Sequence, residues 1–184
     1  MGASAFSGRS SLAINNKSLF FRRIFIFSVI FIFGYLIYLS YQQYQNWSQG
    51  EISKFFLSPH QSISYFIFYV GTRFFAPYLL SLLAAVLFIF AAKKYNQKYE
   101  ERFFYPEEYW FGGVSIFLAS YPGTLFYIVF ILAIAVVLSL IVDRWSLIGE
   151  RLSLYYFWAP VAIFTILITE FWLKTLPWWG LLKI

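Results

Sequence analysis

The sequence contains no cysteine, one histidine (His60) and one aspartate (Asp143) among its 184 residues. The absence of thiols excludes disulfides, thiol nucleophiles and iron–sulfur ligation. A single histidine excludes multi-histidine metal sites, and no Gly-x-Ser-x-Gly motif marks a catalytic serine. These shortages predict no catalytic residue, no metal site and no cofactor, and they favour a protein that is not an enzyme.

Charged residues are also scarce, at 12% of the chain, whereas 61% of the residues are hydrophobic and the mean hydropathy is +0.68. Soluble domains carry about a quarter charged residues. The apolar residues occur in long runs between short polar loops, which is typical of multi-pass membrane proteins. We therefore expect an all-α, polytopic integral membrane helical bundle of about four transmembrane helices.

The net charge of +6 does not indicate nucleic-acid binding. A phosphate-binding surface needs Lys and Arg gathered on a soluble face. Here the basic residues border the hydrophobic runs, as membrane topology requires. The lipid bilayer is the expected partner, and no nucleic acid is expected.

The polarity of the chain divides it into two parts. Residues 1–18 are polar and small, and are predicted to form a disordered cytoplasmic tail. Residues 19–184 are predicted to form one transmembrane domain. Its expected spans lie near residues 20–41, 76–92, 114–142 and 153–173.

Residues 62–92 form the ambiguous stretch, because one helix of that length would measure about 46 Å. Gly71 and Pro77 flank Arg73 and suggest a broken helix near residues 62–77. The stretch is either one broken span or two short ones.

The distribution of Lys and Arg favours four spans with both termini cytoplasmic, because basic residues accumulate on the cytoplasmic side. A hairpin of two short spans would place Arg22 and Arg23 outside. In the four-span arrangement ten of the fourteen basic residues are cytoplasmic: Arg9, Lys17, Arg22, Arg23, Lys93, Lys94, Lys98, Arg102, Lys174 and Lys183.

A second broken helix is predicted near residues 106–123. Pro106 followed by two glutamates is typical of a helix start. Gly112-Gly113 then predicts a break, and Tyr121-Pro122-Gly123 predicts a turn before an uncharged run over residues 124–142. That run would be about 28 Å long as a helix, which matches the hydrocarbon core of a bilayer.

Arg73 and Glu170 are the candidate functional charges, since ionisable groups in membrane segments often mark functional sites. Arg73 is expected at the outer interface, where its side chain reaches the headgroups. Glu170 is expected near the cytoplasmic edge, paired with Lys174 four residues later. The two candidates would then lie on opposite faces of the membrane.

Two pairs of small residues at a spacing of four suggest close helix packing. Ser81 and Ala85 belong to the second predicted span, and Ala135 and Ser139 to the third. These faces predict that the two spans contact each other, or that one contacts another membrane protein or a second copy of this chain.

Residues 76–175 resemble the type IV prepilin peptidase family in layout. Trp110-Phe111-Gly112-Gly113-Val114 stands where that family has a Gly-x-Gly-Asp element, and Tyr121-Pro122-Gly123 stands at its turn. Phe157-Trp158-Ala159-Pro160 is similar to its Pro-Phe-x-Pro stretch. The resemblance implies a helical membrane fold with Gly112 and Gly113 at the position of the active-site element.

The family cleaves with two aspartates, and this chain has Gly113 where one of them would stand. Its only aspartate, Asp143, follows the apolar run. An aspartyl dyad needs two carboxylates that share a proton. A relative of this family would therefore be degenerate and non-cleaving.

Three functions are consistent with these features. The first is a small non-enzymatic scaffold, assembly factor or accessory subunit. The second is a transport or channel-like protein that exposes backbone at its broken helices, with Arg73 or Glu170 facing the cavity. The third is the degenerate peptidase-like protein.

Overall fold

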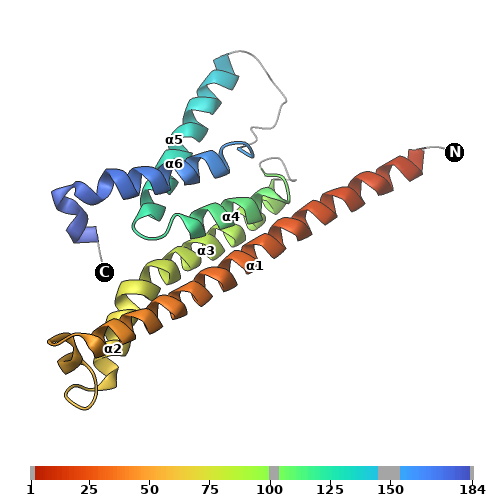
Figure 1. Ribbon diagram of the computed structural model, residues 1–184. Coiled ribbons are helices and arrows are strands. Elements are labelled where there is room, and N and C mark those ends of the chain that lie inside the picture. Colours follow the sequence, from red (N-terminus) through yellow and green to blue (C-terminus); the bar gives the residue numbers. More distant parts are fainter. Residues whose placement is uncertain (1–2, 100–103, 145–153, 183–184) are drawn as a thin grey trace.

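The computed structural model of the protein describes residues 3–99, 104–144 and 154–182, and in these ranges every regular element is helical (Figure 1). The predicted all-α fold is confirmed. The helices are α1 (Ala3–Gln49), α2 (Ile63–Val70), α3 (Ala76–Lys98), α4 (Glu108–Leu118), α5 (Gly123–Arg144) and α6 (Trp158–Phe171). A π-helical turn, η2 (Gly71–Phe75), joins α2 to α3, and three 3-10 helices are η1 (Ser53–Phe56), η3 (Leu173–Thr175) and η4 (Pro177–Leu182).

Four described helical segments are long and apolar enough to cross a membrane: Lys17–Gln49, Ile63–Lys98, Gly123–Leu140 and Trp158–Thr175. Between 11% and 33% of the most apolar window of each segment is buried inside the chain. Water would be a poor solvent for so many exposed apolar side chains. The fold therefore fits a membrane protein.

Helix α1 begins at Ala3, which differs from the disordered tail predicted for residues 1–18. Adding residues to an existing helix needs no new nucleation, so a polar segment can continue an apolar helix. Figure 1 shows that the first turns of α1 extend beyond the other helices.

The stretch from Ile63 to Lys98 is one helical run rather than two short spans. At η2 the backbone N–H of Ala76 bonds to the carbonyl of Gly71, five residues earlier, so the helix widens without breaking. Pro77 follows at the start of α3.

Helix α3 buries a stripe of residues against α4. The stripe is Ser81, Ala85, Ile89, Ala92 and Asn96, and its spacing of three or four residues places it on one face. Helix α4 returns along this face in the opposite direction, as Figure 1 shows. The predicted helix start after Pro106 is confirmed, since α4 begins at Glu108.

Asn96 fixes the connection between these helices. Its side-chain oxygen accepts from the Phe104 N–H at 3.0 Å, and its amide nitrogen donates to the Phe104 carbonyl at 2.9 Å and to the Tyr109 hydroxyl. The side chain is almost completely buried, so these bonds replace water for a polar amide.

Gly112 and Gly113 do not break the helix, contrary to the prediction, because α4 is continuous from Glu108 to Leu118. They are packing sites. A Cβ atom on Gly112 would lie 2.7 Å from the Phe88 ring and 3.1 Å from Trp158, and one on Gly113 would lie 2.7 Å from Ile89. The glycines let α4 approach α3 and α6 more closely than any other residue type could.

A tight turn ends α4 and returns the chain to the beginning of α3. Ser120 has a positive φ of 50°, and the Tyr121 N–H donates to the Pro77 carbonyl at 3.3 Å. The hydroxyls of Ser81 and Thr124 lie 2.8 Å apart, which ties α3 to the start of α5. The third apolar span therefore begins at Gly123, not at residue 114.

Helices α5 and α6 complete the bundle. Helix α6 runs alongside α4, and its first residue, Trp158, is 2% exposed. Helix α5 contacts α6 in its first turns and then leaves the bundle, as Figure 1 shows.

We predict that Gly112→Ala lowers the free energy of unfolding by about 1–3 kcal/mol, because the methyl group would overlap two rings that already contact each other. Gly34→Ala is the matched control, since a Cβ there meets nothing within 4 Å. The control should be neutral or stabilising by up to about 1 kcal/mol. Thermal unfolding of both variants in detergent tests this; equal stability would contradict the packing role.

Candidate functional site

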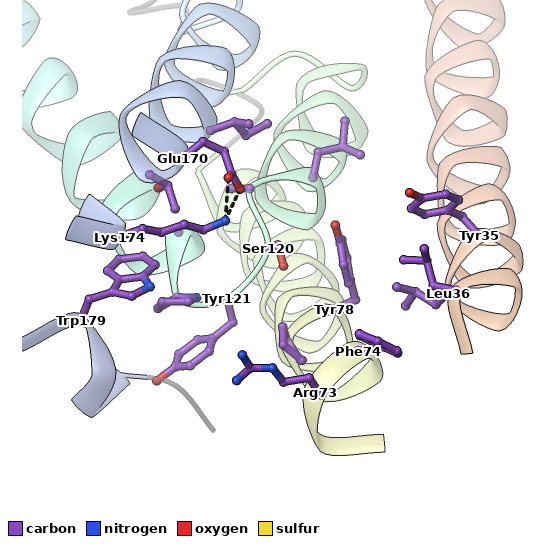
Figure 2. Close-up of a pocket in the computed structure, with 18 of the residues that line it drawn as sticks. Tyr35, Leu36, Arg73, Phe74, Tyr78, Ser120, Tyr121, Glu170, Lys174 and Trp179 are labelled. Atoms are coloured by element: carbon purple, nitrogen blue, oxygen red, sulfur yellow. Dashed lines mark hydrogen bonds and ion pairs between the residues drawn. The ribbon is translucent and has the colours of Figure 1, made fainter. Parts of the chain in front are cut away.

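A pocket of about 400 Å³ lies where α1, η2, the turn after α4 and the end of α6 meet (Figure 2). This volume is within the range of small-molecule sites, about 300–1,000 Å³. Its polar lining includes Tyr35, Thr72, Arg73, Tyr78, Ser120, Tyr121, Thr169, Glu170, Lys174 and Trp179. Its apolar lining includes Leu36, Leu39, Phe74, Pro77, Leu118 and Ile166.

Glu170 and Lys174 form the predicted ion pair across one helical turn. The Lys174 Nζ lies 2.6 Å from both carboxylate oxygens of Glu170. About half of each side chain is exposed, so the pair adds little stability, about 0–1 kcal/mol. Its main effect is to hold one cation and one anion at the pocket.

Arg73 lines the pocket from η2, and Figure 2 shows it below Ser120. In the described part of the chain, the guanidinium has neither a carboxylate partner nor a hydrogen bond. Its five N–H donors are therefore open to solvent or to a ligand.

Two buried polar atoms in the lining make no hydrogen bond within the described residues. They are Thr169 Oγ1 and Trp179 Nε1. Trp179 is 3% exposed, and its ring stacks on Phe126 with centroids 6.1 Å apart. Buried polar groups normally have partners, so these two atoms mark the pocket as a place where a polar ligand or water would be stabilised.

The structure corrects the expectation that Arg73 and Glu170 lie on opposite faces of the membrane. Both line this pocket. The cause is the return of α4 along α3, which places the turn after α4 and the last turn of α6 beside η2.

The same packing does not support the prediction that both termini are cytoplasmic. Lys174 lines the pocket with Tyr35, whereas Lys17 lines a different hollow with Tyr105. Residues 17 and 35 are separated by about 27 Å along α1. The C-terminal segment and the Lys17 part of α1 thus lie at opposite ends of the bundle.

The glycine pair and the two pairs of small residues singled out from the sequence do not line the pocket. Gly112 and Gly113 lie in the interface of α4 with α3 and α6. Ser81 and Ala85 are fully buried inside the chain. Ala135 and Ser139 lie on the part of α5 beyond its main contacts with the bundle.

Sequence reasoning missed most of the pocket. Ser120, Thr169 and Trp179 belong to different helices and turns, and no local motif connects them. The local signals that did point to the pocket were the charges of Arg73, Glu170 and Lys174 and the predicted turn at Tyr121-Pro122-Gly123, which forms one wall.

The pocket presents one carboxylate and two cationic groups, those of Glu170, Arg73 and Lys174. Its one carboxylate is already paired with Lys174. In the described ranges no three His, Cys, Asp or Glu side chains gather as a metal-binding group would.

Comparison with protein-family models, with curated proteins and with solved structures finds no match to this chain. The resemblance to the prepilin peptidase family therefore stays a prediction.

Cysteine labelling tests the position of the pocket relative to the membrane, because the chain has no native cysteine. We expect His60→Cys and Thr175→Cys to react from the same side with a membrane-impermeant maleimide, and Gln97→Cys to react from the other side. All three side chains are exposed. Labelling of residues 60 and 175 from opposite sides would instead support the topology with both termini cytoplasmic. It would contradict the packing described above.

Proposed function

We propose that this chain is a small, non-enzymatic, multi-pass membrane protein that acts as a scaffold, assembly factor or accessory subunit. The observation that carries the proposal is the outer half of α5. This helix contacts the bundle through residues up to Ile134 and then continues to Arg144.

Beyond Ile134, α5 is uncharged as far as Leu140, and one side of this segment is exposed. Val136, Val137 and Leu140 are each more than half exposed. Ala135 and Ser139 lie one turn apart at the edge of this exposed face and are partly buried. Small residues at this spacing let a second helix approach closely. A bulky apolar partner helix would fit such a surface better than a charged one.

The scaffold function predicts that bulk on this face prevents association. The wild-type chain should purify in mild detergent as a stoichiometric complex with its partner. Ala135→Phe should purify as the chain alone. Leu87→Phe is the matched control, because it adds the same ring at an exposed position of α3, outside α5. The molecular mass of the purified species gives the readout. A lone wild-type monomer, or equal loss in both variants, would contradict the proposed surface.

Transport is the second candidate, and the pocket favours it. Arg73 and Glu170 line one cavity together with the π-helical turn, and irregular helices in transporters line their binding sites. In this alternative Glu170 would contact the transported ion.

Transport predicts that Glu170→Gln abolishes proton or potassium flux in vesicles that contain the purified chain. The loss follows because the amide carries no charge and cannot bind a cation as the carboxylate does. Glu51→Gln is the control, since Glu51 is exposed and does not line the pocket. Unchanged flux in Glu170→Gln would exclude the assigned role.

A further inference from the structure

The pocket presents hydrogen-bond donors from three separate elements. Arg73 belongs to η2, Lys174 to η3 and Trp179 to η4. Lys174 uses two of its three ammonium protons on Glu170, so one remains. The indole N–H of Trp179 is buried and has no partner in the described ranges, and Figure 2 shows it on the pocket side of the ring.

The charge of the lining suits a monoanion. Arg73 and Lys174 are cationic and Glu170 is anionic, so the formal charge of these three groups is +1. A single negative charge would neutralise it. Such neutralisation matters because the site is partly enclosed and apolar side chains form much of its wall.

The shape of the donor set favours phosphate over carboxylate. A planar carboxylate is satisfied by one arginine fork. A tetrahedral phosphate offers oxygens in several directions, and here the donors are on different walls of the pocket. An arginine fork, a lysine proton and an indole N–H that come from different walls suit oxygens that point in several directions better than the two coplanar oxygens of a carboxylate.

The location of the pocket fits a headgroup. Tyr35, Leu36 and Leu39 are the α1 residues that line it, and they lie at the end of the apolar run of the first predicted span. Lipid phosphates lie at this depth, next to the hydrocarbon core. Leu118 and Ile166 provide apolar walls for the adjoining chains.

We propose that this pocket binds a phosphate monoanion, with Arg73, Lys174 and Trp179 as donors. The ligand is a phosphodiester headgroup of an anionic phospholipid or a free phosphate. The site is separate from the outer half of α5, so the proposal does not depend on the scaffold function.

Native mass spectrometry of the full chain in detergent tests the proposal. The probes are phosphatidylglycerol, diacylglycerol with the same acyl chains, and inorganic phosphate. We expect the chain to retain phosphatidylglycerol at least about tenfold better than diacylglycerol. Competition by millimolar inorganic phosphate would identify free phosphate as a sufficient ligand, and its failure would show that the lipid chains are needed.

Three variants test whether the donors of the pocket, rather than the net positive charge of the protein, cause the preference for phosphatidylglycerol. Arg73→Gln should remove the preference for phosphatidylglycerol. Trp179→Phe keeps an aromatic ring against Phe126 but loses the N–H, and should reduce the preference about three- to tenfold. Lys54→Gln is the matched control, because it removes a positive charge outside the pocket and should change nothing.

Equal retention of phosphatidylglycerol and diacylglycerol by the wild-type chain would overturn the proposal. An unchanged preference in Arg73→Gln would also overturn it. Circular dichroism and thermal unfolding establish that each variant is folded. If Arg73→Gln does not fold, two other variants test the proposal. Arg73→Lys keeps the positive charge but loses the planar pair of N–H donors, and Trp179→Phe loses the indole N–H. For each, the ratio of retained phosphatidylglycerol to retained diacylglycerol should fall, and an unchanged ratio in both would overturn the proposal.

Discussion

The close approach of α4 to α3 is the contact on which the rest of the structure depends. It requires Gly112 and Gly113, because a side chain at either position would overlap Phe88, Trp158 or Ile89. Dispersion attraction falls steeply with distance. Two helices that approach each other more closely by the width of a methyl group therefore attract each other more strongly across the whole interface. With α4 held on this face, the chain forms a helical hairpin within the bundle, and the uncharged run that follows it starts at Gly123.

This hairpin determines where the pocket forms. Asn96 fixes one end by bonding the backbone of Phe104, and the Pro77 carbonyl fixes the other by accepting from Tyr121. The second of these bonds joins the turn after α4 to the first turn of α3, which directly follows η2. The turn at Ser120 therefore lies beside η2. Arg73 and the turn therefore line the same cavity. Helix α6 packs along α4, and its last turn places Glu170 in this cavity.

The sequence predicted the all-α fold with apolar, membrane-type helices, which depends on composition. It also predicted the Glu170–Lys174 ion pair, which depends on a short spacing along the chain. Long uncharged runs are sufficient to predict membrane helices, and a spacing of four residues is sufficient to predict the pair of Glu170 with Lys174. The position of Arg73 relative to Glu170 was not predictable in this way. Counting Lys and Arg assumes that each apolar run crosses the membrane, whereas residues 108–118 return along α3. A Gly-Gly pair likewise has two meanings, a break or a packing site, and only the neighbouring helix decides between them.

The exposed surfaces of the chain are not equivalent, and side-chain size distinguishes them. Helix α1 exposes large rings, including Phe27 and Phe31, which are 69% and 63% exposed and stack on each other. Such rings keep a neighbouring backbone at a distance, and flexible lipid chains can fill the spaces between them. The outer half of α5 exposes Val136, Val137 and Leu140, and the half-buried small residues Ala135 and Ser139 lie beside them, so bulk around its backbone is lower than on α1. Helix association in a bilayer depends on close packing rather than on hydrophobicity, since lipid is as apolar as leucine. By this criterion the surface of α1 suits lipid chains, which supports the proposal that α5 rather than α1 contacts a partner.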